Sequence, residues 1–378
     1  MKRSKYSILA VILVLALSTV LAGCGANNKT AGVEASSPAL SPSGAAAANA
    51  ASAASGTTAL PASATTAAPT GAAAKPALDP VKIKIADINT NPVFRTAISK
   101  GIFKKYGIEA ELVVFATPAE GINSLFIKQV DVAFGAEFPL LNAVSKGDFS
   151  IIGATGTANE RSASQWRLYV RDGINKPEEL KGKKLSNFRG TFVSYLWDKF
   201  LAEHNVALKD VSVIGQGGMD EALVALKRGE IDAAWVNGST LAEKFTAIEG
   251  VHQLTDMSQT QVRIGGGFIV PNTLLKEHPD AIANFLLALD ETSKFISANQ
   301  EEVAELLYKE VKLPKEAVLK DLPFNTWEVG FAQQSYDSFV SQKKYMVDNG
   351  IIKDDYELGA KINLEPLKRV FPQRVTYK

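Results

Sequence analysis

An abrupt change in composition near residue 80 decides which part of this chain can fold. Between Gly25 and Asp79 the sequence is almost entirely Ala, Ser, Thr, Pro and Gly, with only four charged residues. A segment with so few long apolar side chains cannot bury enough surface to offset the entropy of ordering its backbone. We therefore expect residues 24–80 to form a flexible tether, with a root-mean-square reach of about 40 Å for about 55 residues. The folded region then runs from about Val81 to Lys378.

The segment before the tether has the layout of an export signal. Basic residues within positions 2–5 precede an apolar run from Ile8 to Ala22. At about 1.5 Å per residue this run reaches about 22 Å, which is short of the roughly 30 Å hydrocarbon core of a membrane. We therefore predict a cleaved signal peptide over residues 1–23 rather than a transmembrane helix.

The signal ends in Leu21-Ala22-Gly23-Cys24, and Cys24 is the only cysteine in the chain. These residues resemble the bacterial lipobox, in which the cysteine becomes the acylated N-terminus of the mature protein. The resemblance implies that Cys24 is a lipidation site and that the protein is anchored to the cell membrane outside the cytoplasm. Such an anchor would be stable, because two or more acyl chains bind a protein firmly to a bilayer. A disulfide within the chain is excluded because there is no second cysteine.

The composition and the motifs exclude several classes of function. The chain has 41 Lys and Arg against 40 Asp and Glu, without a basic cluster, so we expect no nucleic-acid partner. The three histidines, His204, His252 and His278, lack zinc-site spacing, and we expect no metal and no cofactor. The nucleophile-elbow, phosphate-loop and dinucleotide-binding motifs are absent, which argues against an enzyme.

From residue 81 onward, short apolar strands alternate with amphipathic helices, which predicts an α/β fold with mainly parallel sheets. A folded region of about 300 residues exceeds the usual size of one core, so two lobes are expected. The chain beyond Asn272 is expected to be mostly helical. We expect strands at Val81–Ala86, Ala110–Phe115, Val130–Gly135, Ile151–Thr155, Leu168–Arg171, Lys184–Asn187, Val211–Gly215, Ile231–Val236 and Ile264–Val270.

Two stretches of the folded region echo one another. In the first, a strand ending at Phe115 is followed by a helix and by Lys128–Ala133. In the second, a strand ending at Gly215 is followed by a helix and by Arg228–Ala234. Each stretch is predicted to form a strand, a crossover helix, a polar turn that contains an aspartate, and a buried strand. The repeat favours two related lobes, although any two β–α–β units share this pattern.

Several segments resemble one family of solute-binding proteins. They are Lys100–Ile108, Glu111–Phe115, Val130–Gly135, Lys176–Leu185 and Gly229–Ala234, and the resemblance extends from Val81 to about Pro372. These segments are similar to the sulfonate-, taurine- and nitrate-type binding proteins of ABC importers, whose superfamily also binds pyrimidine precursors of thiamine. The resemblance implies the type II periplasmic-binding fold, in which two lobes joined by two hinge crossings enclose a ligand cleft. Lobe I would comprise residues 81–171 and 262–378, and lobe II residues 172–261.

The resemblance also implies a role and partners. The protein would be a monomer that captures a small-molecule solute and delivers it to an ABC permease with its ATPase. The leading expectation for the solute is a small anion or zwitterion, such as a sulfonate or taurine. One alternative is a neutral or cationic heterocycle, such as a pyrimidine precursor stacked on Trp235 or Phe188. Another is a secreted lipoprotein enzyme on the same fold, although the cysteine-rich motif of the fungal-type pyrimidine synthases is absent.

In open α/β sheets, ligands bind beyond the carboxyl ends of the strands, where loops lead into helices. Arg189 is the leading candidate by this rule, because a guanidinium beside a helix start favours an anion. The full set of ligand-binding candidates is Asp87, Asn89, Thr90, Asn91, Glu137, Arg189, Gly190, Thr191, Gly217, Gly218, Trp235 and Asn237.

Several of these candidates have a purely structural alternative. Thr191 and Ser239 could cap helices, Trp235 could pack in the core, and Gly217-Gly218 could form only a turn. Glu137 could be a solvated loop carboxylate, or it could receive a ligand amine such as that of taurine.

Overall fold

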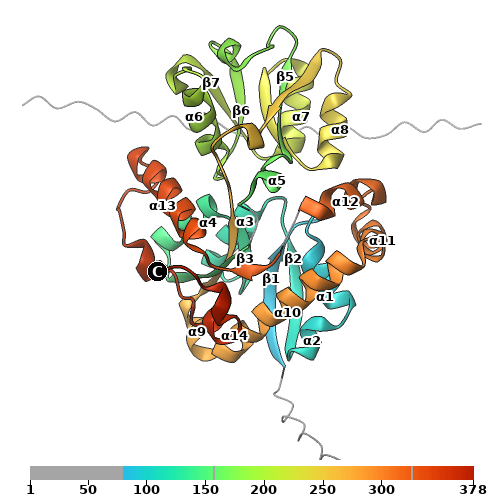
Figure 1. Ribbon diagram of the computed structural model, residues 1–378, viewed down its shortest axis with the longest axis vertical. Helices are drawn as coiled ribbons and strands as arrows, with labels where there is room; N and C mark the ends of the chain where they lie inside the picture. Colours follow the sequence, from blue (N-terminus) through green and yellow to red (C-terminus); the bar gives the residue numbers. More distant parts are fainter. Residues whose placement is uncertain (1–79, 156–157, 325–326) are drawn as a thin grey trace, which may run out of the picture. The chain divides into compact units, whose positions relative to one another are not determined.

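The computed structural model describes residues 80–155, 158–324 and 327–378 (Figure 1). The expected signal peptide, the lipidation site Cys24 and the tether lie outside these residues. The described residues belong to one compact unit. Within them, no helix combines the length and the apolar character that a membrane span requires. Their strands form separate sheets, which we use to define a lobe I and a lobe II.

Lobe I is built on a parallel strand pair and a four-stranded sheet. β1 (Val81–Asp87) pairs with β2 (Ile108–Val114), and the larger sheet has the order β11-β4-β10-β3. A parallel bridge between Ile85 and Val132 joins the pair to the sheet, and the Ala86 N–H donates to the Val132 carbonyl at 2.9 Å. The strands of the larger sheet are β3 (Ala133–Ala136), β4 (Phe149–Thr155), β10 (Gly266–Pro271) and β11 (Val329–Gly330).

Helices pack their apolar faces against these strands to form the core of lobe I. Phe94 of α1 meets Phe134 of β3 edge-on at 5.4 Å between ring centroids, and Phe285 of α10 stacks on Phe103 of α2 at 5.8 Å. The helices are α1 (Pro92–Ser99), α2 (Ile102–Lys105), α3 (Pro118–Asn123), α4 (Glu137–Lys146), α9 (Asn272–Glu277), α10 (Pro279–Ala298), α11 (Gln300–Val311), α12 (Lys315–Asp321), α13 (Gln333–Asp348) and α14 (Glu365–Val370).

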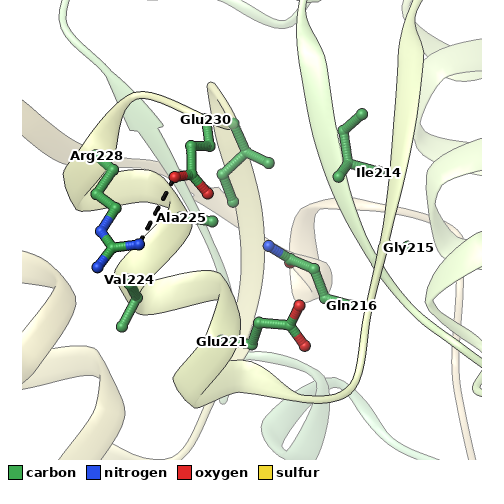
Figure 2. A pocket seen from close by; sticks show the side chains of 9 residues that line it. Ile214, Gly215, Gln216, Glu221, Val224, Ala225, Arg228 and Glu230 are labelled. Carbon is green, nitrogen blue, oxygen red and sulfur yellow. Dashed lines mark ion pairs between the residues drawn. The ribbon is translucent and has the colours of Figure 1, made fainter. Parts of the chain in front are cut away.

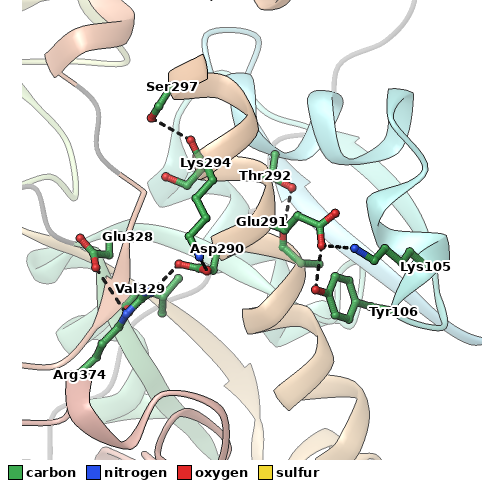
Figure 3. Close-up of polar contacts among 12 residues, drawn as sticks. Lys105, Tyr106, Asp290, Glu291, Thr292, Lys294, Ser297, Glu328, Val329 and Arg374 are labelled. Atoms are coloured by element: carbon green, nitrogen blue, oxygen red, sulfur yellow. Dashed lines mark hydrogen bonds and ion pairs between the residues drawn. The ribbon is translucent and has the colours of Figure 1, made fainter. Parts of the chain in front are cut away.

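Polar residues of α10 hold distant parts of the chain to lobe I (Figure 3). Asp290 accepts a hydrogen bond of 2.6 Å from Nη1 of Arg374, near the C-terminus. The neighbouring residue, Glu291, accepts hydrogen bonds from Nζ of Lys105 at 2.6 Å and from the hydroxyl of Tyr106 at 2.8 Å. The C-terminal segment and the end of α2 are therefore both fixed to the longest helix of the lobe.

Lobe II is a five-stranded sheet with the order β7-β6-β8-β5-β9. Trp197 of α6 and Trp235 of β8 pack at 5.7 Å between ring centroids in its core, and both side chains are fully buried. The strands are β5 (Trp166–Arg171), β6 (Lys184–Phe188), β7 (Ser212–Gln216), β8 (Ala233–Asn237) and β9 (Val251–Asp256), and the helices are α6 (Val193–Glu203), α7 (Met219–Arg228) and α8 (Ser239–Thr246).

The two stretches that echo one another in the sequence have matching roles in the two lobes. Asp131, just before β3, accepts a hydrogen bond of 2.8 Å from the backbone N–H of Lys84 in β1. Asp232, just before β8, accepts one of 2.8 Å from the backbone N–H of Lys184 in β6. Each aspartate thus fixes the start of a buried strand to its neighbour, as expected for related β–α–β units.

Two segments of the chain link the lobes. Residues 158–165, which include α5 (Glu160–Ala163), lead into β5, and residues 257–265 lead into β10. Trp166 at the start of β5 lies opposite Asn237 at the end of β8, and Gly266 at the start of β10 lies opposite Ala136 at the end of β3. Both strands therefore enter at the edge where the parallel strands end, and they must run antiparallel to them.

These two strands correct the expected fold in two respects. The expectation of mainly parallel sheets is wrong, because β5 pairs antiparallel with β8 and β9, and β10 with β3 and β4. The expected lobe boundary at residue 171 is also displaced, since β5 pairs wholly within the sheet of lobe II. Lobe II accordingly begins at about Trp166, and lobe I resumes with β10.

Candidate functional site

The candidate residues follow strands that end at the edge where the chain crosses between the lobes. β1 ends at Asp87, β3 ends directly before Glu137, and β8 ends at Asn237. β6 and β7 likewise end directly before Arg189 and Gly217. The rule for ligand sites in α/β sheets therefore selects residues on one defined edge of each sheet.

A carboxylate of lobe I is bound at the first turn of α8 in lobe II. Gly238 turns the chain out of β8 with a φ of 87°, and α8 begins at Ser239. Both carboxylate oxygens of Asp321, the last residue of α12, lie 3.0 Å from the backbone nitrogen of Ser239. The Ser239 hydroxyl donates to Oδ1 at 2.6 Å, and Nε2 of Gln165 donates to the same oxygen at 3.2 Å. The start of α8 is thus an oxyanion site in which the chain's own carboxylate sits.

An exposed ion pair lies next to this contact. Nζ of Lys320 donates to Oε1 of Glu243 in α8 at 2.8 Å, and both side chains are more than half exposed. Ion pairs in such positions contribute about 0–1 kcal/mol. The partly buried hydrogen bonds of Asp321 are therefore the more specific link between α12 and α8.

A small hollow of about 40 Å³ adjoins Asp321 between the lobes. Thr90 of lobe I and Thr240 of lobe II contribute polar side chains to its lining, and Leu307, Leu313, Val318, Leu322 and Pro92 contribute apolar ones. One water molecule takes up about 30 Å³ in the liquid, so the hollow fits a small chemical group rather than a whole organic solute. A larger solute needs the lobes or the Asp321 side chain to move.

The turn after β1 is held by its own polar residues. Asp87 is buried, and its Oδ2 lies 3.0 Å from Nη2 of Arg95. Burial raises the pKa of Asp87 to about 6, although the Arg95 guanidinium acts in the opposite direction. Asn91 caps α1, and Asn89 accepts a hydrogen bond of 3.5 Å from Arg95. Of the four candidates in this turn, Thr90 is the one that lines the hollow beside Asp321.

Glu137 lies in the interior at the start of α4. Its Oε1 accepts hydrogen bonds from the backbone N–H of Gly265 at 2.7 Å and from the hydroxyl of Ser338 at 3.0 Å. Its Oε2 has no hydrogen-bond partner among the described residues. Burial raises the pKa of Glu137, outweighing the effect of these donors. The alternative of a solvated loop carboxylate is therefore wrong, and a role with a ligand amine stays a proposal.

The buried or bound carboxylates of this region are held by different partners. Asp87 pairs with Arg95, Glu137 with Gly265, and Asp321 with Ser239. Within the part of the chain that the structure describes, no group of three or more His, Cys, Asp or Glu residues could hold a metal ion. The three carboxylates therefore occupy separate positions, each with its own partner.

The turn after β6 presents Arg189 at the surface of lobe II. Its Nη2 donates to the Gly215 carbonyl at 2.8 Å, which leaves most of the exposed guanidinium's donors available to another acceptor. Gly190 turns the chain with a φ of 72°. The Thr191 hydroxyl donates to the Phe188 carbonyl at 2.8 Å and accepts from the backbone N–H of Val193 at 3.3 Å. Thr191 therefore closes a local turn one residue before Phe192, the N-cap of α6, and the expectation that Thr191 itself caps the helix is wrong.

Trp235 belongs to the core of lobe II. Its side chain is fully buried and lies 5.3 Å from the Phe200 ring and 5.7 Å from the Trp197 ring. Phe188 is buried as well. Neither ring can stack on a solute in this arrangement, so the structural alternative for Trp235 is confirmed. Asn237 lies at the end of β8, and its backbone N–H donates to Sδ of Met219 at 3.5 Å.

Gly217 and Gly218 directly follow Gln216, one of the residues that line a larger hollow within lobe II (Figure 2). The backbone N–H of Gly217 donates to Oε2 of Glu221 at 2.6 Å, and α7 follows directly. The hollow, of about 360 Å³, opens between β7 and α7 and is lined by Ile214, Gly215, Gln216, Glu221, Val224, Ala225, Arg228, Glu230 and Ile231. It lies inside one lobe, so these glycines form a turn at its rim rather than a contact between the lobes.

The residues that join the lobes most directly were not among the candidates. Asp321 ends a helix of lobe I that was expected only as a structural element, and Gln165 lies on the first crossing. One local signal could have identified Asp321. An acidic residue at the C-terminal end of a helix is disfavoured by the helix dipole, so its presence indicates a partner elsewhere.

Relatives that match this chain in sequence are named as binding proteins. Over 242 residues the chain is 26% identical to a proposed binding protein of Brucella abortus (strain 2308), covering 62% of this chain and 73% of that protein. Over 225 residues it is 25% identical to a proposed aliphatic sulfonates-binding protein of Bacillus subtilis (strain 168), covering 59% of this chain and 66% of that protein.

Solved structures confirm the fold. The alkanesulfonate-binding protein SsuA from Xanthomonas axonopodis pv. citri, bound to MOPS, matches with a TM-score of 0.67 at 14% identity, over 76% of this chain and 100% of that chain. The desulfurization enzyme DSZB has the same fold, with a TM-score of 0.57 at 14% identity, over 77% of this chain and 99% of that chain. The type II periplasmic-binding fold is thus confirmed, and this fold carries both binding proteins and an enzyme.

A family model settles the relationship at the level of sequence. The model described as "NMT1/THI5 like" matches residues 90–303, which is more than half of the 378 residues. The match includes β3, β8 and the start of α8, so it spans parts of both lobes. The chain therefore belongs to the NMT1/THI5-like family.

Proposed function

We propose that this protein is the solute-binding component of an ABC importer and that its solute is a small organic sulfonate. The observation that carries the anionic part of the proposal is the carboxylate of Asp321 at the start of α8. A sulfonate presents oxygen acceptors and a negative charge of the same kind to the same donors. The sulfonate-binding names among the relatives and the structural neighbours support the chemical class.

The proposed binding step is closure of the two lobes on the solute. The backbone N–H and hydroxyl of Ser239 bind the anionic head, and Thr90 and Thr240 contact the remainder from the two lobes. The apolar lining of the hollow favours a short alkyl chain. Solute contacts with both lobes shift the equilibrium toward the closed form, which a permease with its ATPase would recognise.

A thermal-shift and calorimetry panel on the full chain tests the solute class. The panel contrasts taurine and C1–C8 alkanesulfonates with sulfate, nitrate and an aminomethyl-pyrimidine. We expect saturable binding of a sulfonate, and a loss of about tenfold in affinity when Ser239→Ala is added to a chain that carries Asp321→Ala. In that background the hydroxyl no longer bonds Asp321 and serves the solute alone, and a hydrogen bond to a charged group contributes about 1.5–3 kcal/mol. Ser341→Ala, which removes an exposed hydroxyl from α13, is the matched control. Binding of the pyrimidine alone would contradict the proposal.

We further propose that the protein binds its solute without converting it. The relatives that match in sequence are named as binding proteins, whereas the enzyme DSZB is similar to this chain in fold alone. Incubation of the full chain with the bound sulfonate, followed by mass spectrometry, should recover the solute unchanged. Release of sulfite or of any altered product at a catalytic rate would make the protein an enzyme.

Membrane attachment through Cys24 is the remaining part of the proposal. The lipobox-like Leu21-Ala22-Gly23-Cys24 supports diacylation of this cysteine outside the cytoplasm. Cells that express the protein should incorporate labelled palmitate into it and retain it in the membrane fraction. Cys24→Ser should lose the label and leave that fraction. Membrane retention of an unlabelled variant would disprove the anchor.

A further inference from the structure

We infer that Asp321 is an internal competitor of the solute, because its carboxylate and the solute's anionic group use the same donors at the start of α8. This inference rests on the proposed function, since it takes the solute to be an anion. It makes Asp321 a specificity-determining residue, although it lies on lobe I and outside the strand ends where ligands are expected.

The donors at this position can serve only one oxyanion at a time. The Ser239 N–H lies between the two oxygens of Asp321, at 3.0 Å from each. The single hydroxyl proton of Ser239 is directed at Oδ1, at 2.6 Å. Gln165, whose side chain is buried, donates to the same oxygen at 3.2 Å. A solute anion gains these hydrogen bonds only when Asp321 gives them up.

The space at the start of α8 leads to the same conclusion. A Cβ atom placed on Gly238 would lie 3.6 Å from Oδ2 of Asp321, so the carboxylate rests directly against the turn before the helix. Two negative charges at such short range repel strongly in a partly buried position. The Asp321 carboxylate and the solute anion therefore exclude one another.

Competition from a tethered group selects among solutes. Asp321 is held near the site by α12, and a group on a short tether has an effective concentration in the millimolar range or above. The apparent affinity of any solute is its intrinsic affinity multiplied by the fraction of molecules in which Asp321 does not occupy the site. A free carboxylate such as acetate offers no chemical advantage over Asp321 and should be excluded. A sulfonate has a third oxygen and an alkyl chain, with which it can make contacts that Asp321 does not.

Ethanesulfonate and acetate are the probes for this inference, with calorimetry on the full chain. Asp321→Ala should bind ethanesulfonate at least tenfold more tightly than the wild type. Asp321→Asn keeps the shape of the side chain and loses its charge, so its gain in ethanesulfonate affinity should be smaller. It replaces the alanine variant in the experiment if Asp321→Ala does not fold. Lys320→Ala removes the neighbouring contact between α12 and α8 without touching the anion donors, and its affinity should stay within threefold of the wild type.

The outcomes separate this inference from the proposed function. A gain in Asp321→Ala together with new, competitive binding of acetate supports the inference. An equal gain in Lys320→Ala means that loosening the lobes, not removing a competitor, raises affinity, and it overturns the inference. Unchanged or weaker ethanesulfonate binding in Asp321→Ala also overturns it and leaves the proposed function standing. Failure of both the wild type and Asp321→Ala to bind any sulfonate overturns the proposed function itself.

Discussion

Oε1 of Glu137 lies 2.7 Å from the backbone nitrogen of Gly265, so the start of α4 is bonded to the segment by which the chain returns from lobe II. The hydroxyl of Ser338 in α13 donates to the same oxygen at 3.0 Å. Three separate parts of the chain therefore meet at one buried carboxylate. This contact fixes one end of the return crossing to α4 and α13 of lobe I.

Gly265→Ala should destabilise the protein through this contact. The added Cβ would lie 2.5 Å from Oε1 of Glu137, closer than such atoms approach in practice, and the carboxylate is enclosed. We expect the free energy of unfolding to fall by about 1–3 kcal/mol, as for other overpacked interior sites. Urea denaturation measures this change in the free energy of unfolding. Gly218→Ala is the control, because an added Cβ there meets no described atom within 4 Å. Equal losses in the two variants would contradict this account of Gly265.

Asp87 should make the stability depend on pH between about 4 and 6. Burial raises its pKa from 3.8 to about 6, so the folded state binds the proton more tightly than the unfolded state. The stability gained from protonating Asp87 is fully present below the pKa of this residue in the unfolded state, and it is lost as the pH rises toward 6. At 1.36 kcal/mol per pKa unit this gain amounts to roughly 3 kcal/mol.

Urea denaturation at pH 4, 5, 6 and 7 tests this expectation. Asp87→Asn should show a flatter decline over that window than the wild type, whereas the exposed Asp354→Asn serves as the control. Burial raises the pKa of Glu137 too, so some decline should remain in Asp87→Asn. An identical slope in Asp87→Asn and the wild type would rule out Asp87 as the source.

Two buried tryptophans of lobe II form a matched pair for a hydrogen-bond test. Nε1 of Trp197 donates to the Ser186 carbonyl at 2.6 Å, whereas Nε1 of Trp235 has no acceptor among the described residues. Replacing either by phenylalanine removes the same atoms. Trp197→Phe should therefore cost about 1–3 kcal/mol more than Trp235→Phe, because it leaves a buried carbonyl without its donor. Chemical denaturation that shows equal losses would be evidence against the hydrogen bond.

Arg189 is the candidate that most directly tests recognition of the anion on lobe II. Its guanidinium is exposed and uses one donor on the Gly215 carbonyl. We expect Arg189→Ala to weaken sulfonate binding at least tenfold in calorimetry, because charge-assisted hydrogen bonds to the anion are lost. Arg228→Ala removes another exposed arginine of the same lobe, paired with Glu230, and should leave binding unchanged. Wild-type affinity in Arg189→Ala would remove this residue from the site.

The sequence predicts most strands to within a few residues but misses β9 and the two-residue β11. Apolar residues spaced for a buried strand identify β4 and β8, whereas β9 has the sequence VHQLTD and only its first residue is buried. The directions of β5 and β10 depend on the edge at which the chain enters each sheet. Local patterns contain no information about that edge, so the mixed character of the sheets could not be predicted from them.

The candidate site shows the same limit. The strand-end rule finds Asp87, Glu137 and Asn237, whose positions follow from the order of local elements. The Asp321 contact joins residues 82 positions apart and depends on how α12 packs on α8. Burial of Trp235 is likewise decided by its neighbours from α6. Tertiary contacts of this kind become visible only in the folded molecule.

The strand order of lobe I determines when that lobe can be completed during synthesis. β10 lies between β3 and β4 in the sheet, although the whole of lobe II separates it from them in the chain. A ribosome working from the N-terminus therefore releases β3 and β4 long before the strand that must sit between them. Lobe II, whose strands are continuous in sequence, can fold first, as domains commonly do during translation. Until β10 emerges, the facing edges of β3 and β4 are unpaired, and unpaired strand edges of this kind are prone to aggregation.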